Sequence, residues 1–230
     1  MSDTNAAKKP AAAGGVSIAS SLSIAIVPTV PIYTDINTGA DYNVAIYRPA
    51  SIPNGWYYLG DLALQMPESL PYTSPTVASL APYAVIVQPL VQGAISTVAA
   101  GNTPLWTDQH SGGTQDIEIW QPQPTQSSGY VSLGLFALVG HGYGSQPSVD
   151  PYWSQLAAIN TNLVVAGQAG NLIWNDKNSG SNGSGLWQDI ALWTIQGTGG
   201  IIPTNTFIAV GNYGMPPAGL VPSPNILGTV

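Results

Sequence analysis

One stretch of the sequence decides the fold: residues 106–120 read WTDQHSGGTQDIEIW. A second copy reads WNDKNSGSNGSGLWQDIALW over residues 174–193, and a weaker copy comes first, as YTDINTGADYNVAIY over residues 33–47. Each copy has an aromatic residue, an aspartate two positions later, Ser/Thr-Gly, and an alternating strand that ends in a second aromatic residue. Because the copies recur at a nearly constant period, the sequence predicts an internally repeated fold.

Short strands surround each copy, and helical periodicity is almost absent. Twenty prolines and 26 glycines interrupt the chain, and only residues 153–158 suggest a helical turn. Each copy closes on a Leu/Val-Gly pair, at residues 59–60, 133–134 and 210–211. The predicted strands are residues 21–27, 32–35, 43–47 and 56–64, then 83–88, 105–108, 116–120 and 130–139, then 162–166, 172–176, 189–193 and 206–211.

Three such units suggest an all-β, pseudo-threefold, β-prism-like domain of about twelve short strands, because one small sheet cannot bury both faces alone. A β-sandwich or barrel of the same repeats is the alternative. We expect the alternating apolar residues to share one core, lined by Tyr47, Trp120 and Trp193. The predicted organisation is a flexible tail (1–15), one domain (16–215, with repeats at about 16–70, 80–148 and 160–214) and an extended Pro-rich tail (216–230).

The charge composition excludes several kinds of partner. Only 7% of the residues are charged, four are Lys or Arg, and the net charge is −7. Nucleic acid needs clustered basic residues, and anionic lipid repels an acidic chain. The chain has no cysteine and no apolar run long enough for a transmembrane segment. The region around Lys8, Lys9 and 16–27 is a poor signal peptide, so cytoplasmic location or non-classical release is expected over classical secretion.

Catalysis finds little support in the sequence. The histidines are His110 and His141, and the glutamates are Glu68 and Glu118. Neighbours on one loop do not form a Ser-His-Asp triad, and there is no cluster of histidine and cysteine for zinc. We expect no enzyme activity, no cofactor and no metal site.

Two interpretations of the repeated polar loops remain open. The aspartates and the Ser/Thr-Gly pairs can brace tight turns through backbone hydrogen bonds. Alternatively, they can bind a ligand: a hard cation between carboxylates, or a sugar held by polar groups beside a stacking aromatic. The candidate ligand-binding residues are Asp35, Asp108, Ser111, Asp116, Asp176, Ser179, Trp187 and Asp189.

The third copy carries an insertion at residues 181–185, SNGSG, which precedes Trp187. The insertion is polar and is expected to be flexible, and it places a tryptophan beside the loop. We expect this loop to be the specialised one, with Trp56 and Tyr143 as further stacking candidates.

These motifs resemble the Vps62-related family. The resemblance covers residues 30–215 and rests on the three copies, together with RP at 48–49, GWY at 55–57 and LGD at 59–61. Asn43 and Tyr47 replace the Asp and Trp of the pattern in the first copy, and Ile195 replaces its Pro in the third. The resemblance implies an all-β domain with a non-catalytic recognition role, and similar repeats occur in lipid-transport adaptors and in pore-forming or insecticidal proteins.

The sequence therefore predicts a recognition module that binds neutral glycans or a glycosylated surface through its repeat loops. One alternative is a structural protein that self-assembles by strand pairing of the N-terminal segment. A second alternative is the targeting component of a pore-forming or insecticidal protein.

Overall fold

The computed structural model describes residues 16–17, 21–67, 74–126, 128–165, 167–181, 183–196, 202–217 and 225–226. The predicted tail at residues 1–15 lies outside this part. Within the predicted C-terminal tail, the strand β20 (Asn225–Ile226) pairs with β15 and β18.

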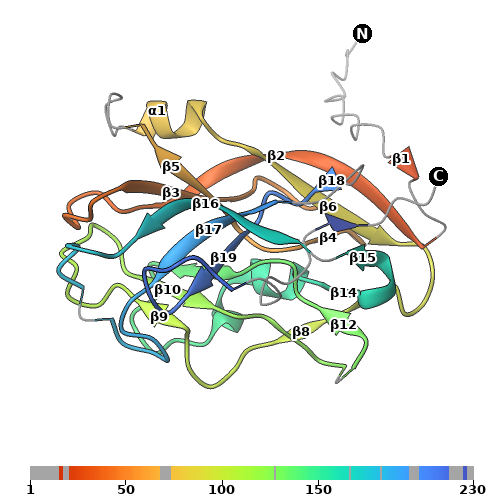
Figure 1. Ribbon diagram of the computed structural model, residues 1–230. Coiled ribbons are helices and arrows are strands. Elements are labelled where there is room, and N and C mark those ends of the chain that lie inside the picture. Colours follow the sequence, from red (N-terminus) through yellow and green to blue (C-terminus); the bar gives the residue numbers. More distant parts are fainter. Residues whose placement is uncertain are drawn as a thin grey trace, which may run out of the picture.

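The described chain is built mainly of short antiparallel strands, so the all-β prediction is confirmed (Figure 1). The helical segments are α1 (Ser74–Ser79), which the sequence did not predict, and the 3-10 turns η1 (Pro147–Val149), η2 (Pro151–Gln155) and η3 (Thr161–Leu163). The remaining strands are β1 (Val16–Ser17), β2 (Leu22–Thr34), β3 (Asn43–Pro49), β4 (Tyr57–Tyr58), β5 (Leu62–Met66), β6 (Tyr83–Pro89), β7 (Ile95–Ser96), β8 (Val98–Ala99), β9 (Trp106–Thr107), β10 (Ile117–Trp120), β11 (Gln123–Pro124), β12 (Tyr130–Val131), β13 (Phe136–Val139), β14 (Ala158–Asn160), β15 (Val164–Val165), β16 (Gln168–Asn175), β17 (Ala191–Gln196), β18 (Ile202–Pro203) and β19 (Phe207–Val210).

Three groups of strands share one order and one register. They are β2-β3-β5, β9-β10-β13 and β16-β17-β19, each with the strand that follows the aspartate loop in the middle. In each group, the first aromatic residue of the motif pairs with an Ile or Leu on the middle strand. The same Ile or Leu pairs, on its other side, with an alanine on the third strand of the group. The matched residues are Tyr33, Ile46 and Ala63; Trp106, Ile119 and Ala137; Trp174, Leu192 and Ala209.

Side chains from all three groups meet in one buried cluster. It contains the first aromatic residue of each copy and the apolar residues that alternate along each middle strand. Its members are Tyr33, Val44, Ile46, Trp106, Ile117, Ile119, Leu135, Ala137, Ile173, Trp174, Ile190, Leu192 and Phe207.

The expected core aromatics lie elsewhere. Tyr47, Trp120 and Trp193 belong to three separate outer clusters. Successive side chains of a strand point to opposite faces, so the residue that follows inward-facing Ile46 or Ile119 points away from the centre. The prediction placed the wrong aromatic residue of each motif in the core.

Several predicted strand boundaries also differ. The strand expected at 130–139 is divided into β12 and β13, and the strand expected at 162–166 begins within the 3-10 turn η3. The strands expected at 21–27 and 32–35 are one 13-residue strand, β2. Its first half pairs with β6 and its second half with β3. Pro28 lies where the partner changes, and Pro31 lies beside a register shift. The missing N–H groups of both prolines therefore fall where the ladder is already interrupted.

A glycine contact divides the strand predicted at 56–64 into β4 and β5. Gly60 lies between them with φ +140°, and a Cβ there would lie 2.7 Å from Cα of Gly134. Gly134 in turn packs on Thr206, where its own Cβ would lie 2.7 Å from the Thr206 Cβ. The third closing position is therefore Thr206, before β19, whereas the predicted pair at 210–211 lies at the end of that strand.

The only arginine of the chain, Arg48, is buried inside this framework. Its Nε and Nη2 donate to the two carboxylate oxygens of Asp61 at 2.7 Å each, and its Nη1 donates to Asp150 at 2.6 Å. The guanidinium also lies 4.3 Å from the ring centroid of Phe136. Burial alone lowers the pKa of Arg48, but the charge and hydrogen bonds of Asp61 outweigh it and the pKa is raised. Arg48 thus ties β3 to β13 and to the start of η2 and is not available as a surface cation.

Candidate functional site

The three repeated loops hold their aspartates inside the protein. Asp35, Asp108 and Asp176 are all buried. In each loop, Oδ1 of the aspartate accepts a hydrogen bond from a backbone N–H group at, or next to, the start of the middle strand. The donors and N···O distances are Val44 at 2.9 Å, Ile117 at 2.9 Å and Ile190 at 3.1 Å. Each carboxylate therefore fixes the start of its own middle strand.

Two of the loops also accept a hydrogen bond from the first aromatic residue of a different copy. Trp174 Nε1 donates to Asp35 at 2.7 Å, and Trp106 Nε1 donates to Asp176 at 2.9 Å. Tyr33 takes the corresponding position toward Asp108, and its buried hydroxyl has no hydrogen-bond partner among the described residues. Burial, and then the charges of Asp108 and Asp35, raise the pKa of Tyr33.

The turns of the three loops repeat the same backbone geometry. Thr38, Ser111 and Ser179 are buried, and each donates its backbone N–H to the carbonyl of the loop aspartate. Positive φ angles occur at the same two positions of every loop, which Asn, His or Gly occupies. These residues are Asn37 and Gly39, His110 and Gly112, Asn178 and Gly180. The fold itself therefore accounts for the polar types at Asp108, Ser111, Asp176 and Ser179.

Desolvation dominates the electrostatics of these carboxyls. Burial raises the pKa of Asp108 and of Asp176, and the hydrogen bonds from Ile117 and Ile190 offset this only in part. The neutral form is therefore more accessible to both groups than to an exposed aspartate.

The second aspartates of the motif, Asp116 and Asp189, are exposed. The Tyr213 hydroxyl donates to Asp189 at 3.0 Å, and the Tyr143 hydroxyl donates to Asp108 at 2.8 Å. Sequence reasoning missed Tyr213, whose position after β19 matches that of Tyr143 after β13. These tyrosines cover the loop carboxylates from the solvent side.

The insertion of the third copy is held against the second copy. Trp187 N–H donates to the Leu105 carbonyl at 2.9 Å, and Leu186 N–H donates to the Pro104 carbonyl at 3.1 Å. The Ser184 hydroxyl lies 2.9 Å from that of Thr107. Ser184 belongs to the insertion, whereas Leu186 and Trp187 follow it, and Asn182 lies outside the described residues. The contacts hold the backbone that carries Trp187 against the second copy.

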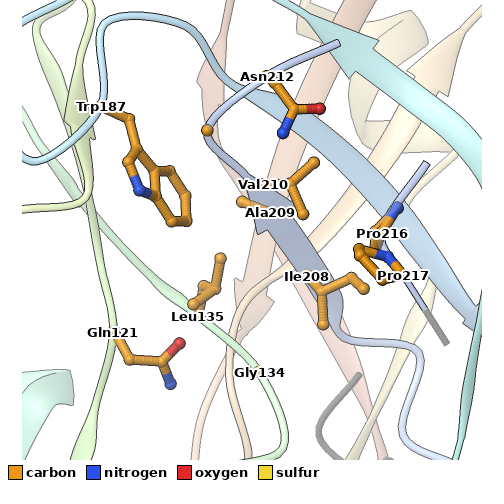
Figure 2. Close-up of a pocket in the computed structure, with 11 residues that line it drawn as sticks. Gln121, Gly134, Leu135, Trp187, Ile208, Ala209, Val210, Asn212, Pro216 and Pro217 are labelled. Carbon is orange, nitrogen blue, oxygen red and sulfur yellow. The ribbon is translucent and has the colours of Figure 1, made fainter. Parts of the chain in front are cut away.

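Trp187 reaches a cavity of about 420 Å³ between the second and third groups of strands. Figure 2 shows Trp187 on one wall, Pro216 and Pro217 on the opposite wall, and Leu135 and Val210 between them. The lining residues are Gln121, Gly134, Leu135, Trp187, Ile208, Ala209, Val210, Gly211, Asn212, Pro216 and Pro217. None of them is charged, and most of the lining is apolar.

Gly211 sets the position of the indole. A Cβ at Gly211 would lie 2.5 Å from Cγ of Trp187, far closer than a van der Waals contact. A residue without a side chain is therefore needed behind the ring.

Two amide groups supply polar atoms to the cavity, and Figure 2 shows them at opposite ends of it. The Gln121 side-chain N–H donates to the Pro122 carbonyl at 3.3 Å, and its Oε1 accepts no hydrogen bond from the described residues. The Asn212 Oδ1 accepts from Gly214 N–H at 2.7 Å, and its Nδ2 donates to none of the described residues. One acceptor and one donor thus remain for a ligand. Sequence reasoning found Trp187 but missed Gln121 and Asn212, because no motif links residues so far apart in the chain.

Other cavities between the groups of strands lack this arrangement. One of about 300 Å³ lies between β5 and the strands β16 and β17, and it has no aromatic lining residue. Another of about 220 Å³ lies beside β2 and includes Tyr33, whose ring belongs to the central cluster. Among these three cavities, that of Trp187 alone combines a tryptophan with two side-chain amides.

Within the described residues, no helix is long and apolar enough to cross a bilayer. The same residues contain no group of three or more His, Cys, Asp or Glu side chains placed to hold a metal ion.

The comparisons with known proteins show a likeness in structure rather than in sequence. No protein-family model matches the chain, and no curated protein matches it in sequence. The crystal structure of GNIP1Aa from Chromobacterium piscinae matches with a TM-score of 0.61 and 24% sequence identity. The match covers 85% of this chain and 34% of that chain, so this chain spans about a third of the length of GNIP1Aa. At this identity the likeness shows the fold.

Proposed function

We propose that this chain is the recognition domain of a toxin-type protein and brings that protein to a target cell surface. The observation that carries the proposal is the match of 85% of the chain to one part of GNIP1Aa, an insecticidal protein. A domain that forms a third of such a protein is large enough to serve as a separate targeting unit. The resemblance to the Vps62-related family, with its occurrence in pore-forming and insecticidal proteins, supports the same role.

The internal contacts support a pseudo-threefold, prism-like arrangement as the basis of this domain. The three groups of strands share a register, and two of the aspartate loops accept hydrogen bonds from tryptophans of other copies. The arrangement produces one framework of strands. Its loops, and the regions between the three groups of strands, differ in sequence. Such a framework presents recognition sites without moving its core.

The chemistry of the surface favours neutral glycans as the class of target. Few residues are charged, and the one arginine is buried. Anionic lipids and nucleic acids are recognised by clustered basic residues, whereas sugars are recognised by amides, hydroxyls and aromatic faces. A glycosylated receptor fits this surface better than a bare lipid bilayer.

Binding to membrane vesicles tests the proposal. The purified chain, labelled at one added cysteine, is titrated onto vesicles from insect midgut epithelium and onto protein-free vesicles of the same lipids. We expect saturable binding to the first only, reduced at least tenfold when periodate has oxidised the vesicle glycans. Equal binding to both vesicles, or no binding to either, contradicts the proposal.

A further inference from the structure

We infer that the Trp187 cavity binds a single neutral sugar ring of a glycan, with the ring against the indole and its hydroxyls on Gln121 and Asn212. The inference deepens the proposed function, since it assigns the ligand site and its chemistry. It also places the site at Trp187 and not at the aspartates and serines of the loops, which made up the other candidate residues.

The buried aspartates Asp108 and Asp176 have few hydrogen-bonding positions left for a ligand. The carboxylate oxygens of Asp108 already accept from Ile117, Tyr143 and Ser111. The two oxygens of Asp176 accept from Ile190 and Trp106. A sugar bound there would have to displace buried hydrogen bonds that hold the strands, and each such loss costs stability.

The cavity of Trp187 has the opposite character. Its volume of about 420 Å³ lies within the range of small-molecule sites, which are mostly apolar with a few convergent polar groups. The apolar floor of Leu135, Ile208 and Val210 faces the half-buried indole. A pyranose ring presents an apolar face of C–H groups and carries hydroxyls around its rim, so its face can lie against the indole while hydroxyls at its two ends reach Gln121 and Asn212.

The polar groups match sugar hydroxyls in kind. Gln121 Oε1 can accept a hydrogen bond, and Asn212 Nδ2 can donate one, while the other atom of each amide is already held by the backbone. A hydroxyl group both donates and accepts. The fixed amide orientations reduce the entropy lost on binding.

The absence of charge from the lining residues sets the specificity. A sialic acid or uronic acid carboxylate would be desolvated here without a cation to pair with. Neutral hexoses and N-acetylhexosamines therefore fit, and acidic sugars do not.

The insertion at residues 181–185 explains why this site belongs to the third copy. Hydrogen bonds from Ser184, Leu186 and Trp187 hold the loop of the third copy against residues 104–107 of the second copy. In the first and second copies the loop is shorter, and no tryptophan follows it at this place. The insertion therefore places the indole beside this cavity, and the other two copies have no equivalent tryptophan.

The test is calorimetric titration of the full chain with methyl glycosides of glucose, galactose, mannose, N-acetylglucosamine and N-acetylgalactosamine. N-acetylneuraminic acid and a proline-rich peptide serve as competing ligand classes. We expect at least one neutral glycoside to bind and the acidic sugar not to bind. Binding of the peptide alone, or of none of the glycosides, overturns the inference.

Substitutions locate the site. We expect W187A to weaken sugar binding at least tenfold, W187F to retain most of it, and Q121A and N212A to weaken it three- to tenfold each. The matched controls are Y83A and N102A, which remove an exposed aromatic and an exposed amide side chain outside the cavity. Sugar binding that is the same in W187A and Y83A contradicts the inference.

The vesicle experiment separates this inference from the proposed function. If W187A binds glycosylated vesicles as well as the unmodified chain does, the targeting function stands and the Trp187 site is wrong. If sugars bind at Trp187 but the chain does not bind the vesicles, the site stands and the targeting function is wrong.

Discussion

Asp176 and Trp187 lie on the same loop, yet the structure uses them in opposite ways. Asp176 is buried, and both its carboxylate oxygens are occupied by donors of the protein. Trp187 is only half-buried and borders a cavity whose two amides each keep one atom for a ligand. The part of the motif that recurs in every copy therefore holds the fold together, while the part found in one copy is available for recognition.

The substitution Asp176→Ala should have the largest effect on stability. It leaves the Ile190 N–H and the Trp106 indole N–H buried without an acceptor, and each such group costs about 1–3 kcal/mol. We expect a loss of about 2–5 kcal/mol in the free energy of unfolding, measured by urea denaturation. The control is D189A, which removes an exposed carboxylate and should cost under about 1 kcal/mol. Equal losses of unfolding free energy in the two variants would show that the buried and the exposed aspartate of the loop contribute equally to stability, which contradicts the prediction.

The substitution Gly211→Ala tests the role of Trp187 at the cavity. Its Cβ would meet the Trp187 ring at 2.5 Å, and overpacking of this kind costs about 1–3 kcal/mol. We expect lower stability and weaker sugar binding together, because the indole must move. A Cβ at Gly142 would meet no atom within 4 Å, so G142A should leave both unchanged. Unchanged sugar binding in G211A would show that the position of the indole is unimportant.

A change of pH should alter the stability that the loop aspartates contribute, and it should leave sugar binding at the cavity unchanged. Burial raises the pKa of Asp108 and Asp176 in the folded protein. Their contribution to stability is therefore fully present below the ordinary aspartate pKa of about 3.9 and is lost as pH rises through the higher folded value. Between pH 4 and pH 7 we therefore expect the part of the free energy of unfolding that these two carboxyls contribute to decrease.

The double variant D108N/D176N provides the reference for this measurement. It lacks both titrations, so its urea midpoint should decline less between pH 4 and pH 7 than that of the unmodified chain. A steeper decline in the variant would mean that hydrogen bonds outweigh burial at these carboxyls. Sugar binding at the uncharged cavity should stay constant over the same range.

The smallest effect is expected at Tyr33. Its hydroxyl is buried without a hydrogen-bond partner among the described residues, so Y33F should change the free energy of unfolding by under about 0.5 kcal/mol. W106F removes the donor to Asp176 and should cost about 1–3 kcal/mol by the same denaturation measurement. A large loss in Y33F would show that the Tyr33 hydroxyl is hydrogen-bonded in solution.

The sequence predicted the strands around each motif because alternation and turn residues are local signals. It misassigned Tyr47, Trp120 and Trp193 because alternation along a strand does not reveal which of its two faces points inward. The inward face carries Ile46, Ile119 and Leu192. The burial of Arg48 was not predictable, since its partners Asp61 and Asp150 are brought together only by the packed sheets. The cavity depended on Gln121, Asn212 and Pro216, which share no pattern with Trp187.

The exchange of hydrogen bonds among the loops has a consequence for how such a domain could arise and unfold. The indole of Trp174 serves the carboxylate of Asp35, and the indole of Trp106 serves that of Asp176. A polypeptide carrying one copy alone would need further identical chains to supply these indole donors, so an ancestral homotrimer is the simplest precursor. For the present chain, loss of any one copy should melt the other two in the same step.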